Sequence, residues 1–149
     1  MIKVRIKKLS ENAVIPFKKH DKDLCYDVRA VSCEEIAPNV YRYGLGLAFS
    51  IERPQYIDKD IRISIDFRPR SSVWETGMVL SNCEGTIDEP YRGEVKAIFY
   101  HVFPYMPRYQ VGDKIGQLKI GMTQSVDWEV VDELDETERG SGGFGSTGK

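Results

Sequence analysis

The chain has 149 residues, enough for one domain with a hydrophobic core of its own. With a net charge of −2, the chain lacks the excess of basic residues that general nucleic-acid-binding proteins have. No apolar run approaches the length of a membrane-spanning helix. The three cysteines have neither zinc-site spacing nor the even number of a disulfide framework. We therefore expect a soluble protein of a reducing compartment, the cytoplasm, that binds neither nucleic acid nor membranes.

Short strand-like segments follow one another along the chain. The clearest covers residues 61–68, where apolar and polar residues alternate with the period of a half-buried strand. Further strands are expected at residues 2–7, 24–30, 41–51, 95–103, 115–120 and 128–131. Many short strands with little helical pattern favour a sandwich or a barrel. The aromatic-rich stretch at residues 99–109 is expected in the core or at a subunit interface.

An aspartate lies inside the apolar strand expected at residues 24–30. A carboxylate in such a strand needs a partner, because an unpaired buried charge is costly. Asp27 would therefore pair with a cation such as an arginine, or it would face a metal-bound nucleotide.

One short helix is expected after the strand at residues 61–68. Ser72 and Glu75 have capping-box spacing, with Ser72 as the N-cap, and Gly77 would end the helix. Because a helix N-terminus binds phosphate, Arg70 and Ser71 are candidate phosphate ligands. The alternative is a helix cap beside a surface arginine.

Residues 82–94 are typical of a hairpin with its turn at residues 88–90. Asp88 could activate a water molecule, Tyr91 could pack against a sugar, and Asn82 could pair with a pyrimidine edge. In the alternative interpretation Asp88 only caps its own turn. A second turn, at residues 112–114, leads into a strand where Gln117 could donate to a phosphate oxygen or simply face outwards.

The composition changes near the C-terminus. Five of the seven residues 132–138 are acidic, and we expect them to separate a domain at residues 1–132 from a glycine-rich arm at residues 133–149. Such an arm is commonly a flexible tail. Here Arg139 and Lys149 suit phosphate binding, Phe144 suits base stacking, and the glycines free backbone N–H groups for an anion. The arm is therefore expected to order as a lid over a nucleotide.

The order and spacing of five segments resemble the five motifs of the homotrimeric dUTPase family. The segments are Asp27 in its strand, Arg70-Ser71 before the helix, Gly85-x-Ile87-Asp88-x-x-Tyr91-Arg92-Gly93, Gly112-Asp113-x-Ile115-x-Gln117-Leu118 and Arg139-Gly-x-Gly-Gly-Phe-Gly-Ser-Thr-Gly148. They span most of the chain. The resemblance implies an all-β fold, a distorted jelly-roll-like β-barrel with one short helix and a flexible C-terminal arm. It also implies a homotrimer in which each active site uses residues from all three chains.

The same resemblance implies an activity, the Mg²⁺-dependent hydrolysis of dUTP to dUMP and pyrophosphate. This reaction lowers the dUTP pool and supplies dUMP for dTTP synthesis. Asp88 would deprotonate the water that attacks the α-phosphorus. Tyr91 would lie under the deoxyribose, and uracil would be read by Asn82 and by the backbone near Gly85 and Ile87.

The remaining implied roles concern the triphosphate and the lid. Phe144 would stack on uracil. Mg²⁺ would arrive bound to the phosphates, and Asp27 would reach it through water or pair with Arg70 instead. The residues implied in phosphate binding are Arg70, Ser71, Ser72, Gln117, Arg139, Gly145, Ser146 and Thr147.

The sequence departs from the family pattern at two places. Leu24 and Cys25 stand where small residues are usual, and Ser72 replaces the glycine that usually follows Arg-Ser. One rival is a dCTP deaminase of the same fold, for which Glu89 or Glu94 would relay protons. Another is a non-enzymatic trimeric module that binds a protein or responds to nucleotide. The spacing of Asp88 and Tyr91 and the complete arm favour the dUTPase.

Overall fold

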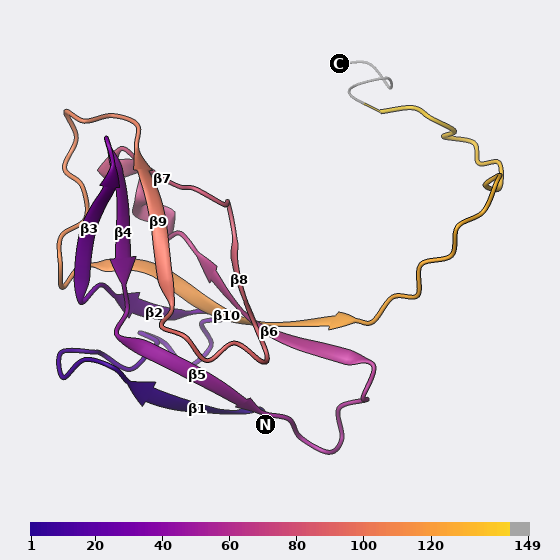
Figure 1. Ribbon diagram of the computed structural model, residues 1–149, viewed down its shortest axis with the longest axis horizontal. Helices are drawn as coiled ribbons and strands as arrows, with labels where there is room; N and C mark the ends of the chain where they lie inside the picture. The colour runs from indigo at the N-terminus through magenta and orange to yellow at the C-terminus, as the bar shows by residue number, and fades with distance from the viewer. Residues whose placement is uncertain (144–149) are drawn as a thin grey trace.

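The computed structural model describes residues 1–143, and within them it has ten strands and one short 3₁₀ helix (Figure 1). The expected all-β, jelly-roll-like fold with one short helix is confirmed. No helix of the described part is long and apolar enough to cross a membrane. The elements in chain order are β1 (Lys3–Lys8), β2 (Tyr26–Arg29), β3 (Ser32–Ala37), β4 (Val40–Gly44), β5 (Leu47–Glu52), β6 (Ile61–Arg68), η1 (Ser71–Thr76), β7 (Met78–Leu80), β8 (Gly85–Asp88), β9 (Lys96–His101) and β10 (Lys114–Gln124).

The strands of residues 1–143 form three antiparallel sheets that do not join into one hydrogen-bonded ring. β1 pairs with β5, a second sheet has the order β2-β10-β6-β8, and a third has the order β3-β4-β9-β7. In Figure 1 the β1–β5 pair lies below the upright strands β3, β4 and β9, and β10 crosses the molecule between them. β9 buries alternate side chains, and β6 buries Ile63, Ile65 and Phe67, which explains why alternation was a clear signal in the sequence.

Aromatic rings from different sheets meet in the core. Phe99 on β9 is fully buried, and its ring meets those of Tyr43, Phe67 and Tyr109 edge-on at centroid distances of 5.9, 6.3 and 5.6 Å. Edge-to-face contacts of this kind stabilise beyond the apolar area they bury. The aromatic stretch is therefore divided: Phe99 and Tyr109 belong to the core, whereas Tyr105 is 83% exposed.

The strand expected at residues 41–51 is two strands in different sheets. The chain bends at Gly46, which has a left-handed φ of +63° that favours glycine. A Cβ there would lie 2.8 Å from Val31 Cγ2 and 2.9 Å from Ser10 Cβ, so the bend is also closely packed. β3 and β7 were not predicted, because β3 contains two adjacent glutamates and β7 has only three residues.

The helix differs from the capping-box prediction. η1 begins at Ser71, its N-cap is Arg70, and the N-cap side chain makes no capping hydrogen bond. The Ser72 hydroxyl instead accepts a hydrogen bond from Arg70 Nη1 at 3.4 Å. The prediction of Ser72 as N-cap is therefore wrong, because the helix is a 3₁₀ turn that starts one residue earlier. Gly77 ends it in a left-handed conformation, as expected.

The strand expected at residues 128–131 is also absent from the described part of the chain. After β10 the chain leaves the body as an extended segment that leads into the arm (Figure 1). Val126, Trp128 and Val130 are 62%, 87% and 98% exposed. An alternating pattern becomes a strand only when a neighbouring strand or core is available, and within the described part of the chain these three side chains are mostly exposed.

The packing around Phe99 predicts how much stability is lost when this side chain is truncated. Replacing Phe99 by alanine should lower the free energy of unfolding by about 4 kcal/mol, because a large cavity would remain among rings that cannot collapse into it. Urea denaturation at equilibrium measures the loss. Tyr105→Ala is the matched aromatic control and should change stability by less than about 0.5 kcal/mol. Similar losses in both variants would contradict this account of the core.

Candidate functional site

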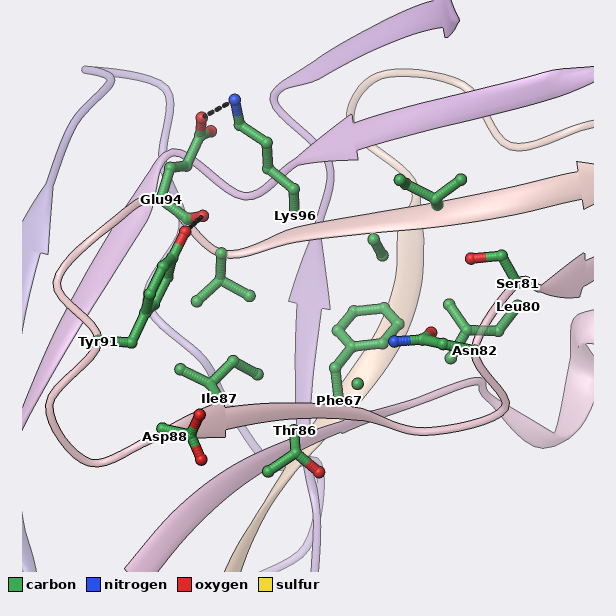
Figure 2. Close-up of a pocket in the computed structure, with 14 residues that line it drawn as sticks. Phe67, Leu80, Ser81, Asn82, Thr86, Ile87, Asp88, Tyr91, Glu94 and Lys96 are labelled. Carbon is green, nitrogen blue, oxygen red and sulfur yellow. Dashed lines mark hydrogen bonds and ion pairs between the residues drawn. The ribbon is translucent and has the colours of Figure 1, made fainter. Parts of the chain in front are cut away.

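A cavity of about 320 Å³ opens between β8 and the sheet that contains β9 (Figure 2). The volume is at the lower end of the range for small-molecule sites. Phe67, Leu80 and Val95 provide apolar walls. The lining includes five of the residues to which the resemblance assigns catalysis or substrate binding, namely Asn82, Gly85, Ile87, Asp88 and Tyr91.

The cavity exists because the two arms of the hairpin expected at residues 82–94 do not pair with each other. The turn itself is present, since the Tyr91 amide donates to the Asp88 carbonyl at 2.9 Å. The two arms, however, join different sheets: β8 pairs with β6, whereas β9 pairs with β4 and β7. The connecting loop is held at Val95, whose backbone exchanges hydrogen bonds with Leu45 and Leu47. The arms therefore diverge and leave room for a ligand.

The polar groups of the cavity come from both ends of β8. Asp88 is the last residue of the strand and lies opposite Ser64 of β6, while Asn82 precedes the strand (Figure 2). The ring of Tyr91 points back toward the loop, and its hydroxyl donates to the Glu94 carbonyl at 3.1 Å. An exposed carboxylate, an amide and a half-exposed aromatic ring thus face one cavity.

Two further lining residues are Glu94, which the sequence analysis named only for the deaminase alternative, and Lys96, which it did not name at all. Glu94 accepts a hydrogen bond from the Gly46 amide at 2.9 Å and forms an ion pair with Lys96 at 3.3 Å (Figure 2). The contact with Gly46 depends on the bend between β4 and β5, which is distant in sequence. No local pattern could have revealed it.

A second cluster surrounds Asp27, which is only 8% exposed. Lys114 Nζ lies 2.9 Å from Asp27 Oδ2, and Gln117 Nε2 donates to Oδ1 at 3.0 Å. Arg70 Nε is 3.5 Å from the same Oδ1, although without hydrogen-bond geometry. The structure therefore contains the pairing of Asp27 with Arg70, one of the two alternatives left open by the sequence. Lys114 was missed, although it lies within the same segment as Gln117.

These contacts determine the charge state of the buried carboxyl. Burial raises the pKa of Asp27, because it disfavours the charged form. Hydrogen bonds from Lys114 and Gln117 and the charges of Arg70 and Lys114 outweigh burial, so the pKa lies below its ordinary value of 3.8. Asp27 is consequently an anion at neutral pH.

The other predicted phosphate ligands lie near Asp27 or in the arm. Ser71 and Ser72 begin η1 directly after Arg70, so they belong with the Asp27 cluster. Arg139 lies in the arm, where its Nε donates to the Gly142 carbonyl at 3.0 Å. Five further candidate ligands lie outside the described residues, namely Phe144, Gly145, Ser146, Thr147 and Lys149.

The cavity and the Asp27 cluster lie at opposite edges of one sheet. Asp27 pairs with Gln117 and Gln117 with Arg68, whereas Asp88 pairs with Ser64, four residues along β6 from Arg68. Three strand spacings amount to about 14 Å and four residue rises to about 13 Å, so the two aspartates are about 19 Å apart. Within one chain they cannot act on the same phosphorus atom.

Residues 1–143 contain no group of three histidine, cysteine or carboxylate side chains that could hold a metal ion. Both Asp27 oxygens already accept from Lys114 and Gln117. The described residues therefore do not fit a protein-held Mg²⁺, and a metal ion would have to be carried mainly by a phosphate ligand.

The Asp27 cluster makes stability depend on pH in a defined direction. Asp27→Asn should lower the free energy of unfolding by about 2 kcal/mol at pH 7, because charge-assisted hydrogen bonds are lost. A carboxyl group whose pKa is lower in the folded than in the unfolded state stabilises the fold at pH values above the unfolded-state pKa. This stabilisation is lost as the pH falls through the folded-state pKa. The difference between variant and parent should therefore shrink below about pH 4. Urea titrations at several pH values would measure it, and a difference independent of pH would contradict the assignment.

Comparison with known proteins points to one family. The dUTPase family model matches residues 11–148. Curated proteins named deoxyuridine 5'-triphosphate nucleotidohydrolase are similar over almost the whole length. The one from Helicobacter pylori strain 26695 is 35% identical, covering 99% of this chain and 97% of its own. The one from Nautilia profundicola is 34% identical, covering 99% and 100%.

Solved structures share the fold. A dUTPase mutant of Staphylococcus bacteriophage 80alpha, determined with dUpNHpp, has a TM-score of 0.80 at 22% identity and covers 99% of both chains. A dUTPase mutant of phage phi11, described with a structural Mg(II) ion, has a TM-score of 0.69 at 21% identity, covering 90% of this chain and 99% of its own. The family match along nearly the whole chain, the full-length relatives and the shared fold together establish that the chain belongs to the dUTPase family.

Proposed function

We propose that this protein hydrolyses dUTP to dUMP and pyrophosphate, which lowers the dUTP pool and supplies dUMP for dTTP synthesis. The observation that carries the proposal is the cavity in which Asp88, Asn82 and Tyr91 face one space. Full-length relatives named for this activity support it.

The chemistry assigned to Asp88 is general base catalysis. Its carboxylate accepts a proton from a water molecule, whose oxygen bonds to the α-phosphorus as the bond from that phosphorus to the α,β-bridging oxygen breaks. Pyrophosphate leaves with the electrons of that bond. A positioned base contributes about 10²–10⁴-fold to such a rate.

The walls of the cavity account for nucleoside selection. The Asn82 amide and the backbone at Gly85 and Ile87 offer hydrogen-bond donors and acceptors to the uracil edge. A base with a different arrangement of donors and acceptors would leave these protein groups unpaired. The Tyr91 ring lies under the deoxyribose and leaves no space for a 2′-hydroxyl.

Phosphate binding is assigned to the cluster around Asp27. Arg70, Ser71 and Gln117 hold the α and β phosphates, and Asp27 fixes the first and last of these side chains. Mg²⁺ belongs to the substrate as Mg·dUTP, in which it neutralises phosphate charge. Arg139 and the following residues of the arm hold the γ-phosphate, and Phe144 covers the base.

The separation of about 19 Å between Asp27 and Asp88 favours a homotrimer with shared active sites. One chain would supply the cavity, another the phosphate cluster and the third the arm. The exposed Trp128 and Val130 are consistent with this arrangement, because apolar side chains gathered on an extended segment are typical of a protein interface.

The contacts of the two glutamates disfavour the deaminase alternative. Glu89 forms an ion pair with Arg53, and Glu94 forms one with Lys96 while accepting from Gly46. A proton relay to the base needs a carboxylate free to exchange its proton, and both of these are held by cations.

A product assay tests the proposal directly. Purified protein with Mg²⁺ is offered dUTP, dCTP, dTTP and UTP separately, and pyrophosphate, phosphate and ammonia are measured. We expect pyrophosphate from dUTP alone. Ammonia from dCTP would instead indicate a deaminase, and no product from any nucleotide would favour a binding module.

The role of Asp88 predicts a loss of turnover without a loss of binding. Asp88→Asn should lower kcat at least about 10²-fold, because an amide cannot accept the proton. The affinity for the non-hydrolysable analogue dUpNHpp, measured by calorimetry, should stay within a few-fold. Near-normal turnover would remove Asp88 from its proposed role.

The role of the arm predicts that a chain ending at Glu138 folds but loses activity. The truncation removes Arg139 and every later residue while sparing all ten strands described here. We expect about 10²-fold lower kcat/KM for dUTP, since the lid no longer excludes water or holds the γ-phosphate. The thermal unfolding midpoint serves as the folding control. Full activity in the truncated chain would contradict the lid.

A further inference from the structure

An ion pair joins a distant loop to the residue that follows Asp88. Arg53 lies directly after β5, and Glu89 directly after β8, 36 positions later. Arg53 Nη2 is 2.8 Å from Glu89 Oε2, and Nε is 3.4 Å from Oε1. Two roughly parallel contacts between a planar guanidinium and a carboxylate restrict direction as well as distance.

Both partners are themselves fixed. Arg53 Nη1 donates to the Asp58 carbonyl at 3.1 Å, which ties the arginine to its own loop. Arg92 Nη1 donates to the Glu89 carbonyl at 2.6 Å, so the backbone of the turn is held from its other side. The ion pair therefore connects two ordered loops.

The turn needs such support because β8 is weakly anchored. It is a four-residue edge strand that pairs only with β6 among residues 1–143, and Asp88 is its last residue. Beyond Asp88 the backbone leaves the sheet through the turn closed by the Tyr91 amide. Strand ends with few hydrogen bonds open most readily.

We propose that Arg53 is a positioning residue that acts through Glu89 to hold Asp88 at its working place in the cavity. The inference rests on the proposed role of Asp88 as the base. Misplacing a reacting group by about 1 Å costs up to about 10²-fold in rate, so a small shift of this turn matters for turnover.

The burial of the pair distinguishes it from ordinary surface pairs. Both side chains are only 27% exposed. The ion pair between Arg5 and Glu52, one residue before Arg53, has side chains that are 71% and 45% exposed. Exposed pairs of that kind contribute little. Arg5→Gln is thus a matched control, because it removes a neighbouring arginine–glutamate pair without touching the turn.

Steady-state kinetics with dUTP tests the proposal on Arg53→Gln, Glu89→Gln, the double variant and Arg5→Gln. We expect each of the first two to lower kcat about tenfold, with KM within about twofold of the parent. The double variant should lose no more than the worse single variant, because both act through one contact. Arg5→Gln should match the parent. An unchanged kcat for Arg53→Gln, or single losses that multiply in the double variant, would overturn the proposal.

Hydrogen exchange at the Tyr91 amide, followed by NMR, gives a second readout that needs no activity. Exchange should be at least about tenfold faster in Arg53→Gln than in Arg5→Gln, with the Val95 amide unchanged as the check on folding. An unchanged Tyr91 amide would refute the positioning role. If the parent does not hydrolyse dUTP while Tyr91 responds, the proposed function fails but the anchoring of the turn stands.

Discussion

The antiparallel pairing of β6 with β10 fixes where the Asp27 cluster lies relative to Asp88. β10 carries Gln117 and Lys114 to Asp27 on one side, while β6 carries the edge strand that ends at Asp88 on the other. Because side chains in a strand point alternately to two faces, a slip of one residue in this pairing would exchange the buried and the exposed set. The core and the site therefore share one register.

Charge is distributed unequally between the two halves of the site. The carboxylates of Asp27, Glu89 and Glu94 each form an ion pair, whereas Asp88 makes none within the described part of the chain. A carboxylate held by a cation is stabilised as an anion and is a poor proton acceptor. The unpaired carboxylate that faces the cavity is thus the one suited to take a proton from water.

Sequence reasoning succeeded where the signal is local. The alternation at residues 61–68 predicted β6, and the spacing of Asp88 and Tyr91 predicted two residues that do share a cavity. It failed where structure depends on distant partners: the split of the strand at Gly46, the divergence of the arms around Asp88, and the absence of a strand after β10. The contacts of Lys114 and Arg53 could not be predicted from the sequence for the same reason, since each contact joins segments that only folding brings together.

The separation of the proposed base from the proposed phosphate cluster, at opposite edges of one sheet, has a consequence for how activity depends on protein concentration. A folded but isolated chain would possess a nucleoside cavity with no phosphate site of its own beside it. Turnover per chain would then rise with protein concentration until assembly is complete, and fall on dilution although every molecule remains folded. Two different inactive chains, one lacking the base and one lacking the phosphate cluster, would together restore some working sites when mixed.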